Sequence, residues 1–154
     1  MDFRFATQDD VELLAKLRIE MRKERETVRL AVSEEEFLRA NIDYFREFIG
    51  NGHYCGIIVE ENGEVAATGG MCFHNHPPSY SIPNGKSAYL LNVYTLPAFR
   101  HRGIAGKIVE ILVEEAEKKG CCKAYLNASK MGKSVYQKFG FEDVENEMVF
   151  DIKH

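Results

Sequence analysis

The sequence predicts an α/β protein, with residues 1–154 forming one domain on a single mixed sheet. Its 154 residues are a typical length for one domain. Apolar residues recur with a period of two in some segments and at helical spacing in others. These segments interleave without an internal repeat or linker, in the predicted order β-α-α-β-β-β-α-β-α-β.

The N-terminal half contains signals for a strand, two helices and a hairpin. Apolar and polar residues alternate over 3–5, which is typical of a short strand. Thr7 and Ser33 are each followed three residues later by an acidic residue, the spacing of an N-terminal capping box. Gly50-Asn51-Gly52 ends the second helix. Asn62-Gly63 separates two β-rich runs and predicts a tight hairpin turn.

Strands and helices alternate in the C-terminal half. Strands are predicted over 87–95 and 123–128, and helices over 104–119 and 132–139. A last strand is predicted over 148–152, because Met148, Phe150 and Ile152 alternate with other residues.

Composition narrows the functional classes. The net charge of -4 argues against a general nucleic-acid binder. No apolar run approaches the roughly 20 residues of a membrane helix, and the first ten residues do not resemble a signal peptide. Four cysteines do not make a disulfide scaffold in a chain of this length. We therefore expect a cytoplasmic protein with reduced thiols and neither a nucleic-acid nor a membrane partner.

The segment RHRGIAGK, residues 100–107, places glycine and positive charge where a helix begins. A helix N-terminus presents unpaired N–H groups and a partial positive charge, which together bind phosphate. Gly103 and Gly106 would let an anion approach the backbone closely. Further charge comes from Arg100, His101, Arg102 and Lys107. From the loop alone, a phosphate site and an ordinary basic turn are equally open interpretations.

Two other phosphate motifs fit poorly. Gly132-Lys133-Ser134 resembles the end of a P-loop, but Asn127 stands where the first glycine of that motif belongs. Too little chain follows for the strand that would carry a metal-binding Asp. The spacing of Gly103 and Gly106 also differs from the G-x-G-x-x-G of a dinucleotide fold.

Two signatures, in order, resemble the GNAT superfamily of acetyl-CoA-dependent N-acetyltransferases. The family pattern R/Q-x-x-G-x-G/A is matched by RHRGIA at 100–105, and Y-x-x-x-G-F by YQKFGF at 136–141. One helix and one strand separate them, and the order of elements matches over almost the whole chain. The resemblance implies a mixed central sheet splayed between its fourth and fifth strands, with helices on both faces.

The resemblance also implies acetyl-CoA as cosubstrate. Backbone N–H groups of residues 101–106 would hold the CoA pyrophosphate. The splayed strand at 93–95 would bind the pantetheine amides like an added strand. Ser129 replaces an Asn of many relatives, and its hydroxyl can still bond pantetheine. The implied cofactor-binding residues are Val93, Tyr94, Thr95, Arg100, His101, Arg102, Gly103, Ile104, Ala105, Gly106 and Ser129.

In the same family pattern, Tyr136 is the acid that protonates the leaving thiolate, and the Val93 amide binds the oxyanion. A core tyrosine is the alternative. The strand at 87–95 has no carboxylate. Asn92 on this strand is the second catalytic candidate, because it can hold a water, but it cannot take a proton, so the general base is unassigned. The leading hypothesis is an N-acetyltransferase that works by direct attack in a ternary complex. The alternative is a noncatalytic acyl-CoA binding or sensing domain.

The sequence also bears on metal binding and on the kind of acceptor. Strand alternation would put Cys72, His74 and His76 on one face, but three ligands without a supporting cluster do not favour zinc, so we expect no metal. The acceptor is expected to be a primary amine on a small molecule or peptide, selected in part by the loop at 74–86. The oligomeric state stays open, although a homodimer is common in such families.

Overall fold

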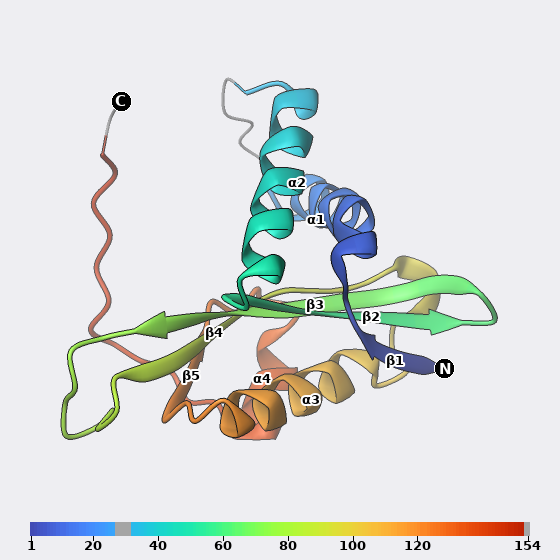
Figure 1. Ribbon diagram of the computed structural model, residues 1–154. Helices are drawn as coiled ribbons and strands as arrows, with labels where there is room; N and C mark the ends of the chain where they lie inside the picture. Colours follow the sequence, from blue (N-terminus) through green and yellow to red (C-terminus); the bar gives the residue numbers. More distant parts are fainter. Residues whose placement is uncertain (27–31, 153–154) are drawn as a thin grey trace.

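A computed structural model describes residues 1–26 and 32–152. Figure 1 shows one open sheet with helices on either side. The strands lie in chain order, antiparallel except for the parallel pair β4–β5. The strands are β1 (Asp2–Phe5), β2 (Tyr54–Glu61), β3 (Glu64–Asn75), β4 (Lys86–Thr95) and β5 (Lys123–Leu126). The helices are η1 (Gln8–Asp10), α1 (Val11–Arg25), α2 (Glu34–Gly50), η2 (Pro97–Phe99), α3 (Ile104–Lys118) and α4 (Lys133–Phe139).

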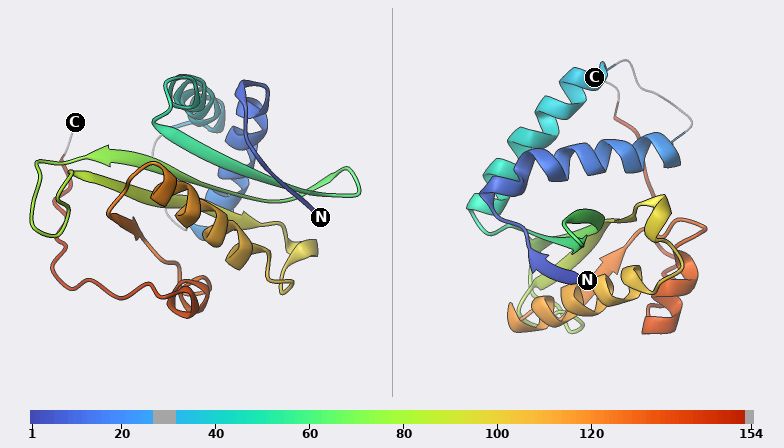
Figure 2. Two further views of the ribbon diagram at one scale, coloured as in Figure 1. Left: turned by 60° about the horizontal axis from the view of Figure 1, so that its bottom comes forward. Right: turned by 90° about the vertical axis from the view of Figure 1, so that its right-hand side faces the viewer.

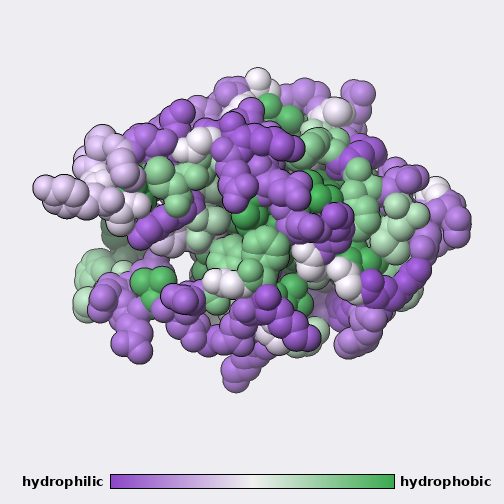
Figure 3. All heavy atoms as spheres, turned by 90° about the horizontal axis from the view of Figure 1, so that it is seen from below, coloured by the Kyte–Doolittle hydropathy of each residue, from purple (hydrophilic) through white to green (hydrophobic). Residues whose placement is uncertain are grey.

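The sheet is covered on both faces, which confirms the predicted mixed α/β fold. Helices α1 and α2 lie on one face, and α3 and α4 on the other (Figures 1 and 2). Alternate residues of β2 serve the two cores: Ile57 and Val59 pack toward α3, whereas Ile58 packs toward α1 and α2. Polar side chains cover most of the face that carries α3 and α4, with apolar groups showing between them (Figure 3). No helix among the described residues is long and apolar enough to cross a membrane.

Both predicted capping boxes and the predicted hairpin turn are present in the structure. The Ser33 hydroxyl accepts from the backbone N–H of Glu36, and the Glu36 carboxylate accepts from the backbone N–H of Ser33. Thr7 and Asp10 make the equivalent pair at η1. Asn62-Gly63 turns the β2–β3 hairpin with φ of 52° and 81°, both in the left-handed region.

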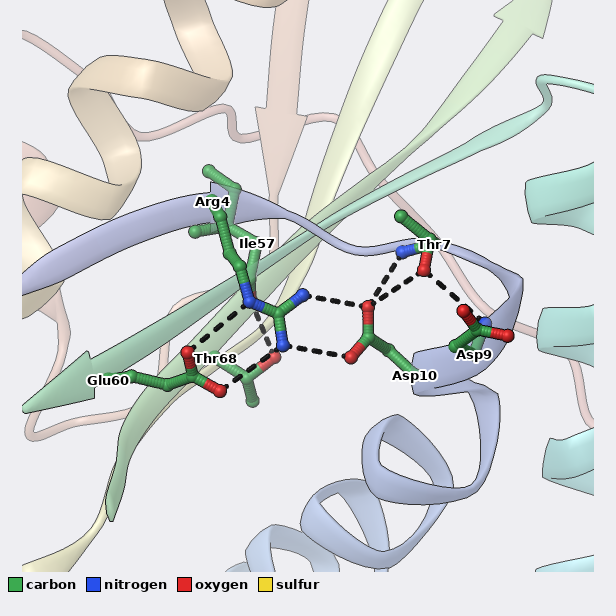
Figure 4. A network of polar contacts seen from close by, with 7 residues as sticks. All are labelled: Arg4, Thr7, Asp9, Asp10, Ile57, Glu60 and Thr68. Carbon is green, nitrogen blue, oxygen red and sulfur yellow. Dashed lines mark hydrogen bonds and ion pairs between the residues drawn. The ribbon is translucent and has the colours of Figure 1, made fainter. Parts of the chain in front are cut away.

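A polar network joins the first strand to the first helix and to β2 (Figure 4). The guanidinium of Arg4 donates to both carboxylate oxygens of Asp10, at 2.8 and 2.9 Å, and also to Glu60. These bonds hold the pKa of Asp10 below its ordinary value and raise that of Arg4. The network therefore fixes where α1 begins relative to the sheet.

Close packing places α3 against the middle of the sheet. A Cβ on Gly69 would lie 2.3 Å from Cγ2 of Ile108, so only glycine lets the helix approach β3 this closely. Ile108 and Leu112 are fully buried at this contact. The start of α3, where the basic loop leads into the helix, is thereby held at a defined position beside β4.

Two expectations about the C-terminal part differ from the structure. The strand predicted over 123–128 ends at Leu126, because its pairing with β4 stops at the Leu90–Leu126 pair. The strand predicted over 148–152 is wrong, since this segment pairs with no strand in the described chain. Met148, Val149, Phe150 and Ile152 are between 73% and 96% exposed. Local alternation is not enough here, because a strand also needs a neighbouring edge that supplies hydrogen bonds.

Candidate active site

The central feature of the site is a bulge in β4 followed by its separation from β5. Thr68 pairs with Tyr94 and Gly70 with Leu91, so Asn92 and Val93 of β4 lie opposite the single residue Gly69 of β3. Asn92 has a φ of 59°. Beyond Leu90, β4 no longer pairs with β5. Among the described residues, no strand pairs with residues 93–95 on the β5 side, as the predicted splay requires. The carbonyls of Val93 and Thr95 accept from the side chains of Arg25 and Arg100.

The basic loop follows directly and ends at the start of α3. His101 and Gly103 have φ of 62° and 77°, so the chain turns sharply before the helix begins at Ile104. In the part of the chain that the structure describes, no side-chain hydrogen bond caps this helix. Apart from its two chain neighbours, a Cβ placed on Gly103 would meet no heavy atom of the described residues within 4 Å. The first turn of α3 thus presents backbone N–H groups beside open space, which suits an anionic group.

These pieces line one cleft of about 570 Å³. It contains every residue that the sequence predicts for the cofactor, together with the predicted acid Tyr136. The set is Val93, Tyr94, Thr95, Arg100, His101, Arg102, Gly103, Ile104, Ala105, Gly106, Ser129 and Tyr136. Ser129 also accepts from the backbone N–H of Gly132 at 3.1 Å, which orders the turn that leads into α4.

The cationic side chains of the loop are paired with carboxylates. Arg102 donates to both oxygens of Glu61, at 2.7 and 2.8 Å, so the β2–β3 hairpin end contacts the loop. Arg100 contacts Glu24 at 2.7 Å, and Glu24 also accepts from the Tyr94 hydroxyl at 3.0 Å. The hydrogen bond from Arg100 holds the pKa of Glu24 below its ordinary value. Of these two carboxylates, Glu24 is the one that bonds to a β4 side chain. Its lowered pKa makes it a weak base.

Tyr136 lies on α4 with its ring against Phe141, the two ring centroids 6.0 Å apart. Burial raises the pKa of the Tyr136 hydroxyl above its ordinary value. The phenol therefore remains protonated at neutral pH and can donate a proton. Tyr136 also borders a second cleft, of about 720 Å³, that runs along β5 and includes Tyr89 and His74.

Asn92 does not line the cofactor cleft and points to the helix α1 side of the sheet. Its side-chain nitrogen donates to the Tyr54 hydroxyl at 3.1 Å, and its side-chain oxygen accepts from Arg18. Both polar atoms of the amide thus already have protein partners. The structure separates Asn92 from Tyr136, although the sequence groups them as the two catalytic candidates.

Sequence reasoning missed the residues that α1 contributes. Arg18 contacts Asn92, Glu24 contacts Arg100 and Tyr94, and Arg25 donates to the Val93 carbonyl at 2.8 Å. The only sequence signal was the spacing of Arg18, Arg22 and Arg25, which puts them on neighbouring positions of one helix surface. That spacing does not tell which way the surface faces.

The Cys72, His74 and His76 side chains serve other contacts. The Cys72 sulfur lies 3.0 Å from the Tyr44 hydroxyl, and Nε2 of His76 lies 2.7 Å from the Ser87 hydroxyl. Within the ranges 1–26 and 32–152, no three His, Cys, Asp or Glu side chains gather as metal ligands would.

Comparison with known proteins agrees with this geometry. The model of the Acetyltransferase (GNAT) family matches residues 16–141. Glucosamine 6-phosphate N-acetyltransferase of Arabidopsis thaliana is 30% identical over 79% of each chain. Thialysine N-epsilon-acetyltransferase of Bos taurus is 35% identical, over 43% of this chain and 41% of its own length. A predicted acetyltransferase of Clostridium acetobutylicum, solved with acetyl-CoA, is 30% identical with a TM-score of 0.88, covering 97% of this chain and 95% of that one.

The fold and the matching relatives define an acyltransferase, which confirms the enzyme class predicted from the sequence. More specifically, the chain belongs to the GNAT family of acetyltransferases.

Proposed function

We propose that this protein transfers an acetyl group from acetyl-CoA to a primary amine by direct attack in a ternary complex. The observation that carries the proposal is the single cleft that joins the uncapped start of α3, the unpaired part of β4 and the Tyr136 hydroxyl. A phosphate site, an amide-binding strand edge and a proton donor are the three features that a CoA thioester needs.

The residues present fit CoA. Gly103 leaves space above the backbone where a side chain would block a phosphate. The N–H groups from His101 to Gly106 would bind the pyrophosphate, and Arg100 and Arg102 would add charge by exchanging their carboxylate partners. Residues 93–95 would pair with the pantetheine amides, and Ser129 would contact the same arm. When bound, acetyl-CoA supplies the activated acetyl group.

The chemical roles follow from the chain's own groups. Tyr136 would protonate the departing thiolate, a role that its raised pKa supports by keeping the phenol protonated. The Val93 amide at the β4 bulge would donate to the developing oxyanion. Glu24 is held ionised by Arg100 and does not serve as an effective base. The acceptor amine would therefore lose its proton to water or arrive already neutral.

The acceptor would be a small amine. Relatives of this chain are named for acetylation of glucosamine 6-phosphate and of thialysine, both small molecules with an amino group. The α1 side of the β4 bulge is where such a molecule would approach, because the opposite side is filled by the core beneath α3.

Calorimetric titration tests the donor, with acetyl-CoA as ligand and ATP as control. We expect acetyl-CoA to bind and ATP not to bind. A panel of amines then tests transfer, followed by the release of free CoA thiol. Absence of acetyl-CoA binding would refute the cleft assignment. Binding without transfer to any amine would instead support a noncatalytic acyl-CoA sensor.

A further inference from the structure

Arg18 and Arg25 differ from the other arginines of the described chain, because neither pairs with a carboxylate. Each of the others does so, namely Arg4, Arg22, Arg39, Arg46, Arg100 and Arg102. Residues 27–31 contain no acidic side chain that might serve as a partner. Both exceptions instead bond to neighbouring residues of the β4 bulge, Arg18 to Asn92 and Arg25 to the Val93 carbonyl.

Arg18 is the more deeply placed of the two. It is half-buried on the face of α1 that meets β4, and its one hydrogen bond among the described residues goes to the neutral amide of Asn92. It lies close enough to Tyr44, Tyr54 and Cys72 to interact electrostatically with each of them. These three groups are neutral at pH 7. The carboxylate of Glu26 does favour the charged form of Arg18, but Glu26 is itself paired with Arg22, so no carboxylate of the described chain contacts the Arg18 guanidinium.

Such a placement is unfavourable for the protein by itself. A guanidinium has five N–H donors in a planar fork that matches a carboxylate or phosphate. Burial is the main reason that the pKa of Arg18 is lowered; the positive charge of Arg22 lowers it further, and the negative charge of Glu26 offsets only part of this. A cation kept partly desolvated with no carboxylate in contact is costly, so its retention beside a reaction centre indicates a ligand that supplies the anion.

We infer that Arg18 binds an anionic group of the acceptor, so that the substrates are small amines that also carry a carboxylate or phosphate. This inference rests on the proposed function, because it assigns the acceptor side of the same site. Asn92, the partner of Arg18, precedes Val93, whose amide would bind the oxyanion. An anion held by Arg18 would therefore place the rest of a short molecule toward the acetyl group. Arg25 borders the same bulge from the next turns of α1.

Paired substrates test this assignment. Lysine and 1,5-diaminopentane differ by one carboxylate, and glucosamine 6-phosphate and glucosamine differ by one phosphate. For wild-type protein we expect at least one anionic member to have a kcat/KM about tenfold or more above that of its neutral twin. The pair that shows this preference identifies the anion as carboxylate or phosphate.

Variants of Arg18 then test whether this residue causes the preference for the anionic amine. Arg18→Met should lower kcat/KM for the preferred anionic amine by about 10- to 100-fold, mainly through KM, and leave its neutral twin within about twofold. Arg18→Lys, which keeps the charge but loses the fork, should retain part of the preference. Arg46→Met, at an exposed arginine on α2, should change neither substrate. Circular dichroism and acetyl-CoA titration check that each variant is folded.

Two outcomes overturn the inference. If Arg18→Met slows both members of a pair equally, Arg18 only supports the β4 bulge through Asn92. If wild-type protein binds acetyl-CoA but, by calorimetry in the presence of CoA, binds neither anionic amine better than its twin, the acceptor carries no recognised anion. Both results leave the donor site intact. Failure to bind acetyl-CoA would instead refute the proposed function.

Discussion

Gly103 allows the phosphate loop to be tested against a matched control in the same chain. Gly103 has a φ of 77° and Gly63, at the tip of the β2–β3 hairpin, has a φ of 81°. A Cβ added at either position would meet no atom within 4 Å. Alanine should therefore cause the same backbone strain at both sites and no steric conflict with the protein at either.

The size of both effects follows from these facts. An alanine in the left-handed region costs about 1–2 kcal/mol. For a chain of 154 residues this lowers Tm by about 3–6 °C. In Gly103→Ala alone, the new methyl group would lie where a phosphate approaches the backbone. Losing one charge-assisted hydrogen bond, worth about 1.5–3 kcal/mol, weakens CoA binding roughly 10- to 100-fold.

Differential scanning calorimetry and isothermal titration with acetyl-CoA measure the two effects separately. We expect both variants to show similar losses of Tm and only Gly103→Ala to lose affinity. Equal affinity of the two variants for acetyl-CoA would refute the phosphate assignment of the loop. An unchanged Tm in both variants would show that alanine causes no measurable backbone strain at these left-handed positions.

Three further predictions concern catalysis, pH and assembly. Tyr136→Phe should lower kcat by about 10²- to 10⁴-fold with little change in acetyl-CoA affinity, and should abolish the alkaline decline in rate that deprotonation of the phenol produces; a variant rate equal to wild type at every pH contradicts the acid role. Asp10→Asn should lower the free energy of unfolding by about 1 kcal/mol at pH 7, because Arg4 and the Thr7 N–H lose a charged acceptor. Asp10 has a folded pKa below its unfolded value of about 3.9, so its contribution is present above that pH and disappears as the pH falls through the folded pKa; chemical denaturation at pH 7 and pH 3 should show the gap narrowing, and a gap that widens in acid contradicts the sign. Finally, we expect a homodimer that covers the exposed side chains of 148–152, so removal of residues 148–154 should reduce the mass measured by light scattering from two chains to one; an unchanged mass would place any dimer contact elsewhere.

Much of the local structure could be predicted because it depends on neighbours in the chain. The capping boxes at Thr7 and Ser33 and the turn at Asn62-Gly63 each need only residues within four positions. The loop at 100–107 is similar, since its glycines and its place before a helix determine where the N–H groups point. The cleft residues could be named from the family pattern, once the second signature at 136–141 indicated the family.

Only the tertiary structure decided which segments pair in the sheet and which distant side chains meet. The alternation at 148–152 predicted a strand that does not form, because no sheet edge lies against it. Asn92 was a catalytic candidate beside Tyr136 because its amide could hold a water on the central strand, but the β4 bulge turns its side chain to the α1 side of the sheet.

Arg18 shows the same limit most clearly. Its spacing from Arg22 and Arg25 is visible in the sequence, yet the same pattern occurs on solvent-exposed helices. Only the packing of α1 against β4 places its charge beside a neutral amide without a carboxylate partner in the described chain. The sequence alone thus determined the family, and it predicted the phosphate loop and the candidate acid, all from local patterns. The acceptor side depends on contacts between residues far apart in the chain, and these arise only when the helices dock on the sheet.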